Sequence, residues 1–349
     1  MAKKKKISGF LLTLIFLFLL ASVGFYVYQK FFTGSIHLKD KNSTFIFIER
    51  DDTFEDVIND INAENIIESL ESFEWLAKKM NLDRNIHPGK YRIQNGMSMR
   101  QIINLIKYNK QQRVRLTYNF QIHTLDEFVS YTGDKLEVSE SEIEDFLSDE
   151  KALHENFKLD PENSFAMIVP GVYEVSWAIS ASELFSLLKE RYAKVWNSTR
   201  TDRAKKAGYS IAEITTIASI VQSESSIESE QEKIAGVYIN RLNCGMPLQA
   251  DPTLRFANKS FDIQRFWNSD KKINSPYNTY MYKGLPPGPI CLVYPQAIDA
   301  TLNYVKHKYI YFCAKPELNG YSDFSTNFTQ HQKYAAAYQR AMTKRGITR

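Results

Sequence analysis

Residues 210–245, which read SIAEITTIASIVQSESSIESEQEKIAGVYINRLNCG, carry the clearest local pattern in the chain and predict two helices joined by a serine-rich elbow. Ser210 and Glu213 form a capping box, in which the two side chains satisfy free backbone N–H groups at a helix start. A second Ser-x-x-Glu motif at Ser229 predicts the start of the next helix. Glu224 lies on the elbow, where the first helix is expected to end.

The position of Glu224 at a helix end bears on its chemistry. Exposed carbonyl groups at a helix C-terminus carry partial negative charge, which disfavours a second negative charge nearby. Partial burial between the two helices acts in the same direction, because burial penalises the charged form of a carboxyl. A carboxyl that stays protonated near neutral pH can protonate a glycosidic oxygen. The alternative is a surface glutamate in a polar turn, and the elbow alone leaves both interpretations open.

Polar residues and stiff loops follow the helix pair. Gln249 and Asp251 stand two residues apart between prolines, an arrangement suited to sugar hydroxyl and amide groups. Asp251 is equally suited to cap a helix that starts at Pro252. The segments PYNTY at 276–280 and GLPPGP at 284–289 combine aromatic rings with turn-forming residues. Such loops are expected either to line a carbohydrate groove or to form a purely structural corner.

The composition excludes several classes of protein. Of the 349 residues 44% are hydrophobic, and the net charge of +4 equals the contribution of Lys3–Lys6, so the rest of the chain is close to neutral. A broad basic surface for nucleic acid is therefore not expected. The three cysteines form no C-x-x-C pair and the six histidines are scattered, so we expect no metal site and buried free thiols rather than a disulfide. The sequence also lacks a G-x-S-x-G elbow and a phosphate-binding glycine loop.

The N-terminus predicts a membrane anchor. Residues 7–29 contain no charged side chain, and a helix of this length spans roughly 30 Å of hydrocarbon. Residues 7–30 are therefore predicted to form a transmembrane helix, with residues 1–6 as a cytoplasmic tail by the positive-inside rule. The rest of the chain is expected on the far side of the membrane. A cleavable signal peptide is the alternative, although its apolar run is usually shorter.

An α+β fold is expected beyond the anchor. Residues 40–112 predict the order strand, helix, helix, strand, which resembles a LysM-like module, a fold that commonly holds glycan strands; a generic spacer has the same order. Residues 113–195 predict a connecting subdomain with a strand at 114–118. Residues 196–349 are expected to form a mixed α+β C-terminal domain, in which the Lys/Arg-rich stretch 200–206 predicts a solvated loop.

Ordered motifs in the C-terminal part carry a resemblance to a known family. The segments are ASIVQSES at 218–225, VYINRL at 237–242, LQADPT at 248–253, YNTY at 277–280 and GLPPGPI at 284–290. Together they resemble the YceG-like, membrane-anchored endolytic murein transglycosylases, and the resemblance extends over essentially the whole chain. It implies a non-hydrolytic peptidoglycan lyase without metal or organic cofactor. It also implies a single-pass protein of the bacterial cytoplasmic membrane, with the LysM-like module and catalytic domain on the extracytoplasmic side.

The resemblance implies roles for individual residues. Glu224 falls on the glutamate that this family uses as the catalytic group. It would first protonate the oxygen between MurNAc and GlcNAc, and then act as a base while the C6 hydroxyl attacks C1 to give a 1,6-anhydroMurNAc end. The residues expected to bind the sugars are Gln222, Gln249, Asp251, Asn278 and Tyr280.

The chain also departs from the family pattern. Gln222 stands where the family has a further glutamate, so an amide replaces a helper carboxylate. Two other departures are Leu292-Val293-Tyr294, in place of an Asn/Thr-Pro-Gly turn, and Ser322, in place of a histidine. The missing carboxylate supports one alternative, a catalytically silent peptidoglycan-binding scaffold of cell-wall synthesis. Another is a hydrolytic muramidase in which Asp251 or Glu228 activates a water. The expected partners are peptidoglycan strands and the membrane, with cell-wall synthases as candidates and no nucleic acid.

Overall fold

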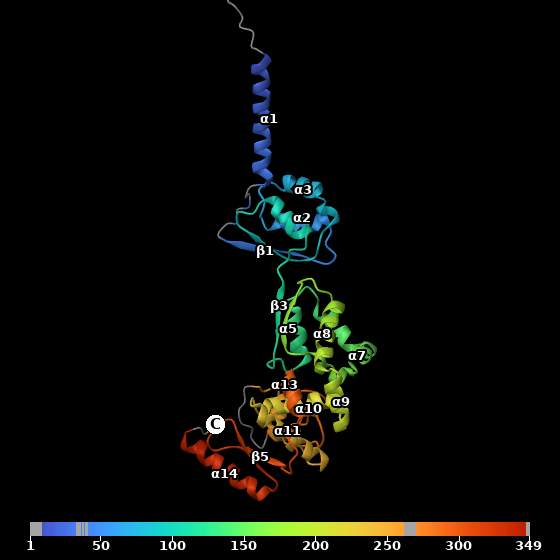
Figure 1. Cartoon of the computed structure of the whole chain (residues 1–349), viewed down its shortest axis with the longest axis vertical. Coiled ribbons are helices and arrows are strands. Elements are labelled where there is room, and N and C mark those ends of the chain that lie inside the picture. Colours follow the sequence, from blue (N-terminus) through green and yellow to red (C-terminus); the bar gives the residue numbers. More distant parts are fainter. Residues whose placement is uncertain (1–8, 33–35, 37, 39–40, 262–269, 347–349) are drawn as a thin grey trace, which may run out of the picture. The chain divides into compact units, whose positions relative to one another are not determined.

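The computed structural model describes residues 9–32, 36, 38, 41–261 and 270–346 (Figure 1). The chain divides into an N-terminal unit, Met1–Val114 with Glu174–Ile179, and a C-terminal unit, Arg115–Tyr173 with Ser180–Arg349. The regular elements of the described residues are helices and small two-stranded sheets, which confirms the expected mixed α+β class. Most of the expected connecting subdomain, residues 113–195, belongs to the same unit as the C-terminal part.

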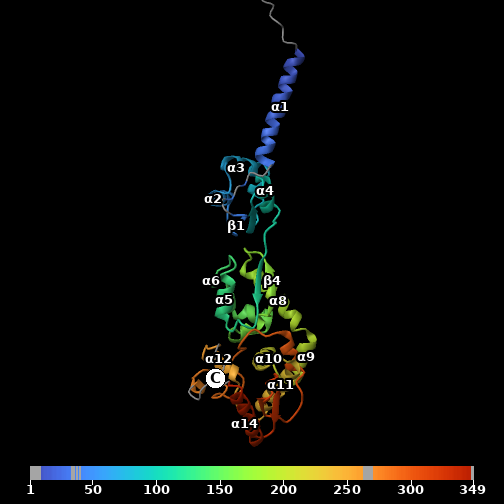
Figure 2. The same cartoon turned by 90° about the vertical axis from the view of Figure 1, so that its left-hand side faces the viewer.

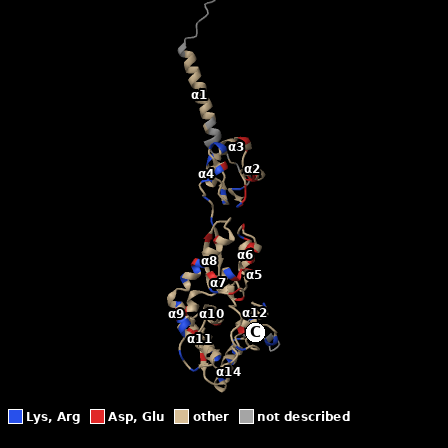
Figure 3. Cartoon of the chain, turned by 90° about the vertical axis from the view of Figure 1, so that its right-hand side faces the viewer, with Lys and Arg blue, Asp and Glu red and all other residues tan. Residues whose placement is uncertain are grey.

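The N-terminal unit begins with helix α1, Gly9–Phe32. Its described side chains, at residues 11–26 and 28, are exposed. None of these residues is Lys, Arg, Asp or Glu, and the described part of the helix is accordingly tan in Figure 3. Within the described part of the chain, the structure contains no helix that combines the length and the apolar character needed to cross a membrane. The predicted cytoplasmic tail, residues 1–6, lies outside the described residues, as do parts of the predicted span, residues 7–30.

A two-stranded antiparallel sheet frames the N-terminal unit. β1, Ser43–Ile48, pairs with β2, Gly89–Gln94, in a register that places Ile46 opposite Tyr91. The helices of this unit are α2 (Phe54–Ala63), α3 (Leu70–Lys79), the 3-10 helix η1 (Leu82–Arg84) and α4 (Met99–Lys107). The expected order of strand, two helices and strand is confirmed, whereas the likeness to a LysM module stays a prediction.

Capping boxes start two of these helices and direct their apolar faces to the core. Thr53 Oγ1 accepts a hydrogen bond from the backbone N–H of Asp56, and Ser98 Oγ accepts one from that of Gln101. Because each start is fixed, one face of each helix turns toward the sheet. The buried side chains of these two faces are Val57, Ile58, Ile61, Met99, Ile102, Ile103 and Ile106.

The strands β3 (Val114–Tyr118) and β4 (Gly171–Val175) pair with each other, and most of their residues belong to the C-terminal unit. Tyr118 packs against Phe128 and Tyr173, with ring centroids 5.0 and 5.1 Å apart. Between and after these strands lie α5 (Leu125–Gly133), α6 (Glu140–Ser148), α7 (Glu150–Phe157), η2 (Pro161–Met167) and α8 (Ala181–Val195).

The predicted helix pair lies among α9 (Ser198–Ala207), α12 (Asp251–Ala257) and α14 (Phe328–Lys344) in the C-terminal unit (Figure 2). α10 (Ile211–Glu224) and α11 (Glu228–Asn243) share a core that includes Ile217 and Tyr238. The other elements are η3 (Asp270–Lys272), α13 (Pro295–Leu302), β5 (Tyr311–Ala314) and β6 (Ser322–Ser325). β5 and β6 pair antiparallel, and α14 packs on them, with His331 stacked on Tyr311.

The prediction of a solvated loop at 200–206 is wrong, because these residues lie in helix α9, Ser198–Ala207. Asn197 caps its start by accepting a hydrogen bond from the backbone N–H of Arg200. The Arg200 side chain also donates two hydrogen bonds to the Asp299 carboxylate on α13, at 2.8 and 2.7 Å. A cap and an ion pair, rather than an apolar stripe, stabilise this helix. The spacing of apolar residues in the sequence therefore does not reveal it.

Gly236 allows a distant segment to approach α11 closely. A Cβ atom at this position would lie 2.5 Å from the backbone oxygen of Val305 and 2.7 Å from Nε2 of His307. We expect Gly236→Ala to lower the free energy of unfolding by about 2–3 kcal/mol, because backbone atoms must move to admit the methyl group. Chemical denaturation measures this beside Ser229→Ala, a small change at an exposed position of the same helix. Equal stabilities of the two variants would contradict the prediction.

Candidate active site

The elbow between α10 and α11 is fixed by contacts other than the predicted capping box. α11 begins at Glu228 rather than after Ser229, and its N-cap residue, Ile227, offers no side-chain hydrogen bond. Ser225 Oγ instead accepts a hydrogen bond from the backbone N–H of Ile227 at 3.1 Å, and Gln231 Nε2 donates to the Ser225 carbonyl oxygen at 2.6 Å. The prediction of a cap at Ser229 is therefore wrong, because Ser225 and Gln231 tie the turn from either side.

Glu224 is the last residue of α10 and is half-buried. The Tyr238 hydroxyl, on a fully buried side chain of α11, donates a hydrogen bond to Glu224 Oε1 at 2.7 Å. Burial raises the pKa of Glu224 to about 7, and the negative charge of Asp251 acts in the same direction. The Tyr238 hydrogen bond and the positive charges of Arg255 and Arg241 oppose this rise in pKa. Near neutral pH this carboxyl is divided between its two forms, so it can both give and take a proton.

Asp251 and Tyr280 form a second polar pair. The Tyr280 hydroxyl donates to Asp251 Oδ1 at 2.5 Å. Burial raises the pKa of Tyr280, and the charges of Asp251 and Glu224 act in the same direction. Asp251 is the exposed first residue of α12, and its carboxylate binds Tyr280 instead of capping the helix. The structure thus brings Asp251 and Tyr280 together within electrostatic range of Glu224.

The other predicted sugar contacts, Gln249 and Asn278, are placed very differently. Gln249 is exposed, with a backbone φ of +51°. Asn278 is fully buried: its Nδ2 donates to the backbone oxygens of Lys271 and Ile273, and its Oδ1 accepts from the Tyr280 N–H at 3.0 Å. Both ends of the Asn278 amide are thus occupied inside the loop. In this structure Asn278 positions Tyr280 and does not present its side chain to a ligand.

Gln222 clamps the segment that contains Leu292 and Tyr294. Its Nε2 donates to the Leu292 carbonyl oxygen at 3.0 Å, and its Oε1 accepts from the Tyr294 N–H at 2.8 Å. A carboxylate cannot make both contacts, because it has no proton to donate to the carbonyl oxygen. The amide at this position therefore suits the backbone that Leu292-Val293-Tyr294 adopts.

We expect Gln222→Glu to lower the free energy of unfolding by about 1–3 kcal/mol at neutral pH, because the Leu292 carbonyl oxygen loses its donor and faces a carboxylate. Protonation restores the donor, so the loss of stability should shrink as the pH falls. Denaturation of the variant and the wild type at matched pH values measures this. Gln339→Glu, at an exposed position of α14, is the control. A loss of stability that stays the same at acidic pH would contradict the role of the Gln222 amide as a hydrogen-bond donor to Leu292.

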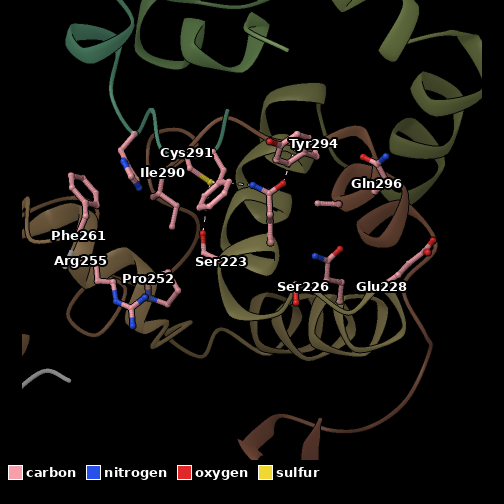
Figure 4. A pocket seen from close by; sticks show the side chains of 15 residues that line it. Ser223, Ser226, Glu228, Pro252, Arg255, Phe261, Ile290, Cys291, Tyr294 and Gln296 are labelled. Carbon is pink, nitrogen blue, oxygen red and sulfur yellow. Dashed lines mark hydrogen bonds between the residues drawn. The ribbon is translucent and has the colours of Figure 1, made fainter. Parts of the chain in front are cut away.

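A cavity of about 670 Å³ lies beside the elbow (Figure 4). Gln222, Ser223 and Ser226 line it from the elbow, and Pro252 and Arg255 line it from α12. Its other walls include Phe120, His123, Phe261 and residues of the 290–297 segment. The Glu224 carboxyl is turned toward Tyr238 and is not among the lining groups. The elbow therefore carries the Glu224 carboxyl and also contributes residues to the wall of the adjacent cavity.

Sequence reasoning missed Tyr238, Arg241 and Arg255. Tyr238 lies in the apolar face of α11, where spacing marks it as an ordinary core residue. Arg241 is buried; its Nε donates to the Ile310 carbonyl oxygen at 2.7 Å and its Nη1 to that of Leu248, just before Gln249. No local signal identifies these roles, because each depends on segments that meet only in the folded unit.

The candidate metal-binding group belongs to the N-terminal unit, whereas one thiol, that of Cys291, lines the cavity. Among the described residues, the acidic side chains of Glu49, Asp51 and Asp52 form a group whose oxygen atoms lie within 4.8 Å of one another. These residues are in the N-terminal unit, whereas Glu224 is in the C-terminal unit. All three cysteines are free, as expected, but only Cys291 is buried, because Cys244 is exposed and Cys313 is half-buried.

Comparisons with known proteins agree with the motifs in the C-terminal unit. The model of the YceG-like family matches residues 46–337. An endolytic murein transglycosylase of Bacillus subtilis is 27% identical over 90% of both chains. Another, from Streptococcus pneumoniae, is 24% identical over 93% of this chain, which spans 64% of that relative's length.

A solved structure shows the same fold. The crystal structure of a YceG-like protein from Listeria monocytogenes superposes with a TM-score of 0.55, over 84% of this chain and 99% of that one, at 23% identity. Because the family model covers most of the sequence, the chain belongs to the YceG-like family.

Proposed function

We propose that this protein is an endolytic peptidoglycan lytic transglycosylase in which Glu224 is the catalytic acid and base. The observation that carries the proposal is the carboxyl of Glu224, which has a pKa of about 7 and accepts a hydrogen bond from a buried tyrosine. Membership of the YceG-like family supports it, as do relatives that are named endolytic murein transglycosylases.

In the proposed reaction one group moves a proton twice. Protonated Glu224 gives its proton to the oxygen between MurNAc and GlcNAc, and the C1–oxygen bond of MurNAc breaks as positive charge develops at C1. The resulting Glu224 carboxylate takes the proton of the C6 hydroxyl of the same sugar, whose oxygen then bonds to C1. The product is a 1,6-anhydroMurNAc end, and the enzyme returns to its protonated form. The pKa of about 7 suits both steps, because neither form of the carboxyl is strongly favoured near neutral pH.

Neighbouring residues are assigned to sugar binding and to positioning. Asp251 and Tyr280 lie within electrostatic range of the acid, and Gln249 is exposed two residues before Asp251. We assign all three to the sugar hydroxyl and amide groups. Asn278 and Gln222 act indirectly, because they hold the segments that carry Tyr280 and Tyr294. No metal or organic cofactor is needed for this chemistry.

The anchor and the location of the protein are part of the proposal. The exposed, uncharged side chains of residues 11–26 and the preceding Lys3–Lys6 support a single-pass anchor in the bacterial cytoplasmic membrane with its N-terminus inside. The catalytic unit would then act on the extracytoplasmic side, where strands are made, with cell-wall synthases as candidate partners.

The mass of the products tests the function. Purified glycan strands are incubated with the full chain, wild type beside Glu224→Gln, and the ends are analysed by mass spectrometry. Anhydro ends, lighter than reducing ends by one water, are expected from the wild type alone. Reducing ends would instead indicate a muramidase that activates water with Asp251 or Glu228. Intact strands from both proteins, together with retained strand binding, would indicate the scaffold alternative.

A further inference from the structure

Arg255 is a cationic group in the wall of the cavity that has no hydrogen-bond or ion-pair partner among the described residues. Its Nε is buried and has no hydrogen-bond acceptor among the described residues. Within the same part of the chain, no carboxylate lies within ion-pair distance of its guanidinium. Buried donors in native proteins normally have an acceptor. The acceptor for this donor is therefore expected to be a ligand in the cavity.

The surroundings of Arg255 define one end of the cavity. His123 stacks on Phe261, with ring centroids 3.8 Å apart, and Phe120 is exposed beside them in the cavity wall. Burial lowers the pKa of His123, which keeps the imidazole neutral near pH 7. Of the described residues that line the cavity, Arg255 alone carries a fixed positive charge. Figure 4 shows Arg255 and Phe261 at one end and Glu228 at the other.

We propose that this end of the cavity, built from Arg255, Phe120, His123 and Phe261, binds a carboxylate on the peptide attached to the substrate strand. The inference rests on the proposed function, since it concerns the same substrate. The sugars of the strand are neutral, and its carboxylates lie on the peptides that extend from the lactyl groups of MurNAc. The arginine fork matches a carboxylate in a two-bond geometry. The aromatic walls suit the apolar parts of a short peptide.

A second source of the same chemistry exists. A MurNAc that has lost its peptide exposes the carboxylate of its lactyl group, which an arginine would bind equally well. The peptide carboxylate is favoured because aromatic rings line the cavity together with Arg255 and offer surface that a bare lactyl group would leave uncovered. The two sources are separated by strands with and without peptides.

Arg255 also acts on Glu224, so its test must separate two effects. Its positive charge lowers the pKa of Glu224, and its removal would change the rate on every substrate. An effect through Glu224 appears in kcat and in the pH profile, whatever the strand carries. An effect through carboxylate binding appears in KM and only on strands that have the carboxylate.

The experiment compares the full chain with its Arg255→Gln and Arg255→Lys variants on uncrosslinked strands. One strand keeps its free peptide carboxylates, a second has them converted to carboxamides, and a third has no peptides. We expect Arg255→Gln to lower kcat/KM about tenfold on the first strand, mainly through KM, and less than about twofold on the second. Arg255→Lys should recover part of the loss. Arg340→Gln, which removes an exposed arginine from α14, should leave all rates unchanged.

Equal losses on the first and second strands would overturn the proposal, and a loss confined to the third would assign the lactyl carboxylate instead. A separate binding measurement tests the carboxylate subsite even if the protein turns out not to cleave strands. Calorimetry measures the affinity of a peptide-bearing disaccharide for two proteins, the Glu224→Gln variant and the same variant with Arg255→Gln added. Because both proteins lack the catalytic acid, the measurement reports binding without cleavage. Binding that weakens about tenfold on loss of Arg255 supports the subsite even if the wild type cuts nothing. Equal binding by both proteins overturns it.

Discussion

Glu224→Gln is expected to slow strand cleavage about a thousandfold without disturbing the fold. The amide keeps the shape of the side chain and can still accept the hydrogen bond from Tyr238. It has no proton to give to the glycosidic oxygen, however, and cannot accept one from the C6 hydroxyl. Initial rates of anhydro-end formation, measured with the full chain below pH 7, test this expectation. A variant that retained more than about a tenth of the wild-type rate would rule out Glu224 as the essential acid.

Stability measurements keep this result interpretable. The folded state disfavours ionised Glu224, so ionisation of this group lowers the free energy of unfolding of the wild type. This loss of stability is absent below the ordinary pKa near 4.5 and complete above pH about 7. Glutamine carries no charge, and the variant should therefore be at least as stable as the wild type above pH 7. Glu144→Gln, the same substitution at an exposed position of α6, should leave both rate and stability unchanged. A less stable Glu224→Gln protein at alkaline pH would show that the carboxylate has an unrecognised structural role.

The wild-type rate is expected to fall about tenfold for each pH unit above about 7, which is about 100-fold at pH 9. The sign follows from the first step, which needs the protonated form of Glu224, and that form is lost as the pH rises through its pKa. The same group becomes the base during the cycle, so no acidic limb is expected from a second carboxylate. A bell-shaped profile with an acidic limb would instead indicate two catalytic carboxyl groups.

Tyr238→Phe should shift this alkaline limb of the rate profile to higher pH. The Tyr238 hydroxyl stabilises the Glu224 carboxylate, so its loss raises the pKa of Glu224 further. The variant should also be slower at its plateau, because the carboxyl loses the group that orients it. Tyr108→Phe, at an exposed position in the N-terminal unit, is the matched control for removal of a hydroxyl. An unchanged limb in Tyr238→Phe would mean that the hydrogen bond does not set the pKa of the acid.

The sequence by itself determined the elements whose signals are local. The capping box at Ser210 predicted a helix start correctly, because both of its partners lie within one helical turn. The end of that helix near Glu224 was also predicted correctly, although the capping box expected at Ser229 did not form. Helix α9 was missed because it has no apolar stripe, and the ion pair that supports it beside its Asn197 cap, between Arg200 and Asp299, joins residues far apart in the sequence.

Only the tertiary structure decided what surrounds Glu224. Tyr238 reaches its carboxyl because α10 and α11 fold back on each other, and Asn278 is buried because its loop closes over it. Arg255 lines the cavity because α12 lies beside the elbow. These placements depend on packing between distant segments, which local backbone preferences do not encode. The raised pKa of Glu224 has the same origin, since its largest cause is burial by residues that the chain brings together only on folding.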